Sequence, residues 1–218
     1  MREYRRATHP WGAWLVALLL GLAGGAAWAE DPQRQLEEAS DRMFDALERE
    51  QERLRENPEH IYTIVDEILV PLVDFERASQ WVLGPHWRQA SPEQRERFMR
   101  EFRTLLVRFY GQALAEFVVS NGVPPRDVVR FQPMRGEPEG GQAVVRSQIR
   151  PPGGGQPVSV AYRMSQRNDE WRVFDVAVDG ISMIATYRSS FAAEIRQGGM
   201  DGLLRTLAER NRRLAQPQ

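Results

Sequence analysis

The hydrophobic pattern of this chain changes from helical to strand-like at residues 121–125, and back to helical after Gly180. Before the first change, residues 33–56 and 59–70 have the spacing of amphipathic helices. Ser91-Pro92-Glu93-Gln94 is typical of a helix start, with a Ser cap, Pro at the first position and Gln three residues after the cap. The helix that follows should reach about Ser120. Its expected apolar stripe is Phe98, Phe102, Leu105, Leu106, Phe109, Ala113 and Phe117.

The middle of the chain favours strands. Glycine, proline or Asn168-Asp169 separates successive segments, so neighbours can pair as antiparallel hairpins. The expected strands are residues 127–132, 142–150, 157–166 and 171–179. Two helices, about 181–196 and 201–214, should close the chain on either side of Gly198-Gly199. Helices, then strands, then helices predict an α+β fold: a curved antiparallel four-stranded sheet packed against several helices.

The last strand and the next helix are strongly patterned. Alternation puts Phe174, Val176 and Val178 on one face of the strand, and Val173, Asp175 and Ala177 on the other. Ile181, Ile184, Phe191 and Ile195 then follow at helical spacing. Together with the face of Val158, Val160, Tyr162 and Met164, these side chains are expected to point inward. The pattern alone leaves open whether that interior is filled or hollow.

The first residues have the character of an export signal. Arg2, Arg5 and Arg6 precede an apolar stretch from Ala13 to Ala26, and Ala27-Trp28-Ala29 suits signal-peptidase cleavage. This apolar run is shorter than the ~20 residues of a membrane-spanning helix. We therefore expect a cleaved signal peptide at residues 1–29 and one mature domain at residues 30–218. No Cys is present, which excludes thiol catalysis and Cys-based metal sites.

Motifs for catalysis and cofactor binding are scarce. His60 and His86 are the two histidines after the signal, and they do not have the spacing of metal ligands. Gly153-Gly154-Gly155 precedes a strand instead of a helix, so it predicts a turn and not a phosphate loop. The formal net charge of −1 argues against general nucleic-acid binding. We expect no metal, no cofactor and no nucleic-acid partner.

Residues 171–191 closely resemble a segment of the MlaC family, also called toluene-tolerance auxiliary proteins. There a strand beginning with Trp leads into Asp-Val-x-Val-x-Gly-Ile-Ser and then Tyr-Arg-Ser-x-Phe. Further landmarks follow in the family's order along most of the mature chain. They are Val73-Asp74-Phe75, Val82-Leu83-Gly84, Ser91 to Arg95 before Phe98 and Phe102, and the pair Val160 and Tyr162.

This resemblance implies a soluble periplasmic phospholipid carrier of a Gram-negative bacterium, which helps to maintain outer-membrane lipid asymmetry. It implies a pocket between sheet and helices for the acyl chains of a diacyl phospholipid, with the head group outside. The implied partners are an outer-membrane lipoprotein–porin complex and an inner-membrane ABC transporter with a lipid-binding periplasmic ring. The expected pocket lining is Phe98, Phe102, Leu105, Leu106, Phe109, Val158, Val160, Tyr162, Met164, Phe174, Val176, Val178, Ile181 and Ile184.

Two other functions compete with the carrier. An exported cone-fold enzyme acting on a small hydrophobic substrate would need an acid and a tyrosine in one apolar cavity, and Tyr162 and Asp175 are the candidates. Asp175 has the opposite strand parity to Val176, so we expect it outside the cavity, bound to an Arg or a backbone donor. A lipid-free envelope adaptor is the other alternative. We favour the carrier and expect no enzymatic activity.

Overall fold

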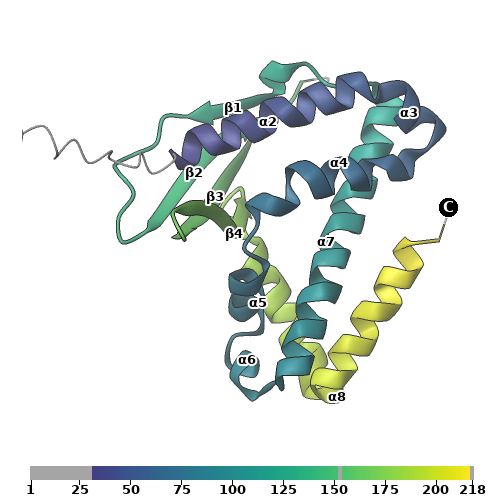
Figure 1. Cartoon of the computed structure of the whole chain (residues 1–218), viewed down its shortest axis with the longest axis vertical. Coiled ribbons are helices and arrows are strands. Elements are labelled where there is room, and N and C mark those ends of the chain that lie inside the picture. The colour runs from purple at the N-terminus through teal and green to yellow at the C-terminus, as the bar shows by residue number, and fades with distance from the viewer. Residues whose placement is uncertain (1–30, 152–153, 217–218) are drawn as a thin grey trace, which may run out of the picture.

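The computed structural model describes residues 31–151 and 154–216 of the chain (Figure 1). The expected signal peptide lies outside these residues. The first helical segment is α2 (Pro32–Arg49), α3 (Gln51–Glu56), the 3-10 turn η1 (Pro58–His60) and α4 (Ile61–Ile68). The second is the 3-10 turn η2 (Val70–Leu72), α5 (Phe75–Leu83), α6 (Pro85–Gln89) and the long α7 (Pro92–Asn121). None of the helices in the described residues is both long and apolar enough to cross a membrane.

The start of α7 confirms the sequence prediction. Ser91 accepts a hydrogen bond from the backbone N–H of Gln94, whose side chain accepts from the N–H of Ser91, and Pro92 opens the helix. Helix α7 then runs along the molecule beside the other helices (Figure 1). Its lower half packs Phe98 and Phe102 against Phe191 of α8, and its upper half packs Ala115 and Val118 against α4.

The sheet follows the 3-10 turn η3 (Arg126–Val128). Its strands are β1 (Val129–Gln132), β2 (Gln142–Ile149), β3 (Val158–Arg167), β4 (Glu170–Val178) and β5 (Ile181–Ser182). They lie in sequence order, and each pairs antiparallel with the next. The α+β fold is therefore confirmed. The sheet has a fifth strand because Ile181 and Ser182, expected in a helix, pair with the end of β4.

Helix α8 (Met183–Leu214) closes the fold. It bends at Gly199, whose φ of 67° and ψ of −173° are not helical, so two helical arms form where two helices were expected. Both arms pack against the lower half of α7, through Phe191 on the first and Leu203 and Leu207 on the second.

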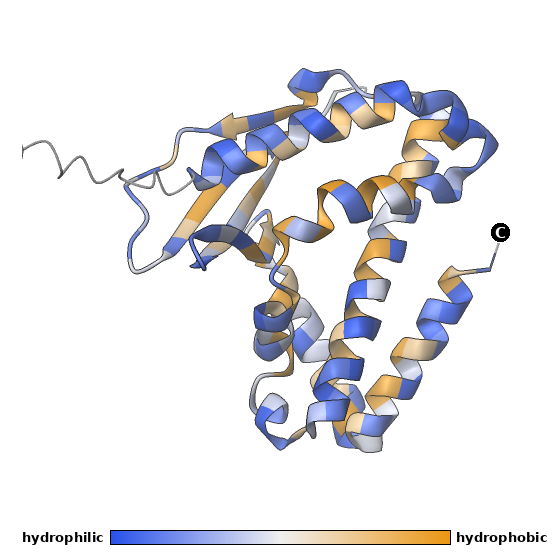
Figure 2. Ribbon diagram, viewed as in Figure 1, coloured by the Kyte–Doolittle hydropathy of each residue, from blue (hydrophilic) through white to orange (hydrophobic). Residues whose placement is uncertain are grey.

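One face of the sheet is covered by α2. Leu36 and Ala39 of α2 pack with Val145, Met164 and Trp171 in a shared core. The opposite, hydrophilic side of α2 is visible in Figure 2. The other face of the sheet is open at β2, where Val144 is exposed, whereas Phe174 and Asp175 of β4 are buried.

A β-bulge in β4 changes which residues share a face. Arg163 pairs with Asp175, but the next residue, Met164, pairs with Val173, so Phe174 is the extra residue. Val173 therefore lies on the same face as Val176, joining the core beneath α2. The expectation that these two residues lie on opposite faces is wrong, because strict alternation along the strand is interrupted at Phe174.

Candidate functional site

An apolar cavity of about 360 Å³ lies where the helices meet the sheet. Helix α7 contributes Phe102, Leu106 and Tyr110, one per turn, since residues four apart share a helix face. Other walls come from the end of α4 through η2, from α5, from β4 and from the start of α8. These residues are Val65, Leu69, Val70, Val73, Phe75, Ala78, Val173, Phe174, Asp175, Val176, Val178, Met183, Ile184 and Tyr187. We call this space the central cavity.

The central cavity opens to solvent on one side. Three of its lining residues are among the exposed large hydrophobic residues of the protein: Leu69 is 37% exposed, Tyr110 44% and Val178 37%. The opposite wall is closed, because Phe102 is 2% exposed and Ile184 7%. Apolar side chains around an opening are typical of a site for a hydrophobic ligand.

The polar groups along the central cavity are neutral or already bound. Burial, and a hydrogen bond with Tyr110, raise the pKa of Tyr187, so its hydroxyl stays protonated at physiological pH. Asp175 is 4% exposed, and its carboxylate accepts hydrogen bonds from Ser182 Oγ at 2.7 Å, the Ile184 N–H at 3.1 Å and Arg163 at 3.2 Å. The expected Arg and backbone partners of Asp175 are thus confirmed, but the expectation that Asp175 lies outside the cavity is wrong, since it is one of the residues that line it.

A second apolar cavity, of about 490 Å³, lies between α2, the upper part of α7 and the sheet. Its lining includes Met43 and Phe44 of α2, Phe117 of α7 and Tyr162 of β3. Leu69 lines this cavity as well as the central cavity. We call it the upper cavity. The two cavities therefore adjoin at a residue that is itself part of the opening.

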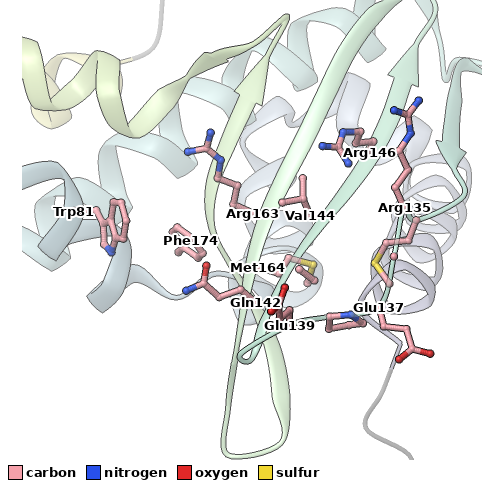
Figure 3. A pocket seen from close by; sticks show the side chains of 14 residues that line it. Trp81, Arg135, Glu137, Glu139, Gln142, Val144, Arg146, Arg163, Met164 and Phe174 are labelled. Carbon is pink, nitrogen blue, oxygen red and sulfur yellow. The ribbon is translucent and has the colours of Figure 1, made fainter.

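The open face of the sheet has a different character. A groove of about 550 Å³ runs across it, with Arg135, Arg146 and Arg163 among its lining residues (Figure 3). Phe174 lines this groove and the central cavity, so it forms a wall between them. Trp81 packs against Phe174 with ring centroids 5.7 Å apart. The guanidinium groups make this groove unsuitable for hydrocarbon.

The structure brings some of the predicted lining residues together. Those that line the central cavity are Phe102, Leu106, Phe174, Val176, Val178 and Ile184. Tyr162 lines the upper cavity. Phe98 and Leu105 are buried in the core between α7 and α8. Val160 and Met164 are buried in the sheet, and Val158 is half-buried at the start of β3.

Two predicted residues do not point inward. Phe109 is 53% exposed and packs edge-on against Tyr110, with ring centroids 5.1 Å apart. Ile181 is 67% exposed because it belongs to β5, where it pairs with Val178, instead of the apolar stripe of α8. The expectation of an inward orientation is wrong for both.

The sequence prediction missed several residues that line the central cavity. Tyr110 continues the series of Phe102 and Leu106 by one more turn, and Tyr187 lies three residues after Ile184, so helical spacing could have found both. Leu69 and Val70 could not be found in this way, because they lie where α4 ends and η2 begins.

The pair that an enzyme would need does not meet. Tyr162 pairs with Val176 across the two strands. Asp175, which directly precedes Val176 on β4, lies on the other face of the sheet. Burial raises the pKa of Tyr162, although a hydrogen bond with Ser147 opposes this effect. A tyrosine that stays protonated, and a carboxylate held by three donors, do not form an acid–base pair.

Known proteins are similar to this chain in sequence, and one of them also in fold. A phospholipid-binding protein from Ralstonia solanacearum, solved in complex with a phospholipid, is 33% identical with a TM-score of 0.73; the match covers 85% of this chain and 99% of that one. The intermembrane phospholipid transport system binding protein MlaC of Haemophilus influenzae is 26% identical over 175 residues, 79% of this chain and 78% of the relative. Toluene tolerance protein ttg2D of Pseudomonas putida is 27% identical over 188 residues, 86% and 83% of the two chains.

The family comparison covers most of the described chain. Residues 37–209 match the model of the MlaC protein family. This range begins in α2 and ends in the second arm of α8, so it includes all the walls of the central cavity and, except for Leu36, those of the upper cavity. The chain belongs to the MlaC protein family.

Proposed function

We propose that this protein is a periplasmic phospholipid carrier, and that the central cavity shelters an acyl chain. The observation that carries the proposal is the apolar central cavity, open at Leu69 and Tyr110. The phospholipid bound by the Ralstonia solanacearum relative supports the same ligand class here. The predicted export signal at residues 1–29 supports the periplasmic location.

The two cavities suit a lipid with two chains. Each has a volume within the range of about 300–1,000 Å³ that ligand pockets commonly have. Since Leu69 borders both, one chain can enter each cavity from a glycerol group placed at their junction. In this arrangement the head group stays in solvent.

The energetics of transport favour a carrier with these properties. Burying a methylene group is worth about 0.8 kcal/mol, so a chain of roughly sixteen carbons needs on the order of 12 kcal/mol of apolar shelter. Water does not provide it, whereas a closed apolar wall such as Phe102 and Ile184 does. A site close in free energy to the membrane interior can both take up and release lipid.

The finer part of the proposal concerns partners. We infer that the protein shuttles lipid between an outer-membrane lipoprotein–porin complex and an inner-membrane ABC transporter with a lipid-binding periplasmic ring, and so maintains outer-membrane lipid asymmetry. The Haemophilus influenzae relative, named for an intermembrane phospholipid transport system, supports this role. Such membrane partners would supply the direction of transport.

The proposal is tested by the lipid that the protein carries. Protein exported with its own signal and purified without detergent should yield phospholipid in near-stoichiometric amounts on organic extraction and mass spectrometry. Protein stripped of lipid should reload when it is mixed with phospholipid vesicles and separated from them. A protein that yields no phospholipid and takes up none from vesicles would contradict the carrier function.

A further inference from the structure

The junction of the two cavities locates the head group of a bound lipid. A glycerol group whose two chains enter the central and upper cavities must lie beside Leu69, the residue that the cavities share. Leu69 is 37% exposed, so groups attached to that glycerol reach solvent at this point. Charged side chains within one helical turn of Leu69 are therefore within reach of the lipid phosphate.

An ion pair occupies this position. Asp66 lies three residues before Leu69, on the same side of the end of α4, since residues at this spacing are neighbours on a helix. Its carboxylate accepts a hydrogen bond of 2.8 Å from the guanidinium of Arg103 on α7. Arg103 is three residues before Leu106, a wall of the central cavity. The pair thus joins α4 to α7 beside the opening.

We propose that Arg103 binds the phosphate diester of the lipid, and that Asp66 holds its guanidinium in place when no lipid is bound. This inference rests on the proposed carrier function. The side chains of Arg103 and Asp66 are 46% and 47% exposed, and ion pairs this exposed to water are weak, so the partner can be exchanged readily. A guanidinium offers two parallel N–H groups to phosphate oxygens, a stronger and more specific arrangement.

Three other arginines of α5 and α7 have partners elsewhere. Arg108 donates to the backbone carbonyl of Asn211, and Arg77 lies over the ring of Phe174, 4.6 Å from its centroid. Arg100, one turn before Arg103 on α7, pairs with Glu96 of the same helix at 2.8 Å. Arg100 carries the same charge on the same helix and is also in an exposed ion pair, but its partner is on α7 and not on α4, which makes it the matched control.

The test compares two ligands that differ only in the phosphate head group. Delipidated mature protein is titrated calorimetrically with dioctanoylphosphatidylglycerol and with dioctanoylglycerol. Arg103→Gln should weaken binding of the phospholipid about tenfold, the effect of losing a charge-assisted hydrogen bond, and should leave diacylglycerol binding unchanged. Arg100→Gln should change neither. Asp66→Asn, which frees Arg103, should strengthen phospholipid binding about threefold without affecting diacylglycerol.

Several results would overturn the inference. One is that Arg103→Gln changes the affinity for phospholipid and for diacylglycerol equally, or changes neither. Another is that Arg100→Gln weakens phospholipid binding as much as Arg103→Gln does, without affecting diacylglycerol binding. Displacement of the phospholipid by inorganic phosphate would assign the site to free phosphate instead. If Arg103→Gln does not fold, the Asp66→Asn variant provides the test. Weaker phospholipid binding by Asp66→Asn would contradict the proposal that Arg103 exchanges Asp66 for the lipid phosphate. Native protein that binds neither ligand would refute the carrier function itself, a result distinct from the loss of head-group selectivity.

Discussion

Replacing Val176 with glutamate should abolish phospholipid loading while the protein stays folded. Val176 lies on β4, opposite Tyr162 on β3, and its side chain lines the central cavity. A carboxylate there would be desolvated by an acyl chain and would have no partner. An unpaired buried charge costs about 3 kcal/mol or more, which corresponds to at least about a hundredfold loss of affinity.

A matched variant separates the cavity from the sheet as a whole. Val144→Glu introduces the same charge on β2, but on the open face, where Val144 is 36% exposed. This variant should load phospholipid normally from vesicles. Thermal melting of both variants checks that lost loading is not lost folding. Normal loading by folded Val176→Glu, or equal loss in both variants, would show that the acyl chain does not contact this wall.

Asp175→Asn should lower the free energy of unfolding by about 3 kcal/mol, because one amide oxygen replaces two carboxylate oxygens that together serve three donors. Asp175 holds Ser182 and the Ile184 N–H, and thus ties β4 to the start of α8. The Ile184 N–H is in a buried position, so water cannot replace the hydrogen bond that it would lose. Arg163 is half-exposed, and its contribution is smaller.

The control for this prediction is Asp179, the residue that directly follows β4. Asp179 accepts a hydrogen bond from the Ser159 N–H at 2.8 Å in an exposed position. Asp179→Asn should therefore cost less than about 1 kcal/mol, since water can replace the lost interaction. Urea unfolding followed by circular dichroism measures both. A similarly small decrease in the free energy of unfolding of the two variants would mean that Asp175 does not anchor α8.

The helices and strands could be predicted where local signals determine them. The capping box at Ser91 marks the start of α7, and turn residues delimit the strands to within about two residues. Gly199 interrupts α8 between the two arms because its backbone adopts a conformation that favours glycine. These features depend on residues that are close in the chain.

The errors come from interactions between distant residues. The bulge at Phe174 depends on the register between β3 and β4, and it moves Val173 to the face of Val176. Ile181 has the hydrophobicity of a helix stripe, but it completes a strand pair with Val178 and stays exposed. Hydrophobic periodicity does not distinguish these outcomes. The sequence of β4 is compatible with a regular or a bulged strand, and that around Ile181 with a strand or a helix.

The cavities themselves are beyond the reach of sequence patterns. Phe98 and Phe102 occupy one stripe of α7, yet Phe98 fills a core and Phe102 lines the central cavity. The same residue types form a filled or a hollow interior, depending on how helices and sheet are spaced. The resemblance to the MlaC family, and not the hydrophobic pattern, led to the expectation of a pocket.

Photo-crosslinking with a phospholipid whose acyl chains carry a diazirine tests the location of the bound lipid most directly. The loaded protein is irradiated, digested and analysed by mass spectrometry. We predict crosslinks on the walls of the central cavity, foremost Leu106 and Tyr110 of α7 and Val176 of β4. Val144 and Arg146, on the open face of the sheet, should remain unlabelled. Labelling concentrated on that open face, with none on α7 or β4, would contradict the account.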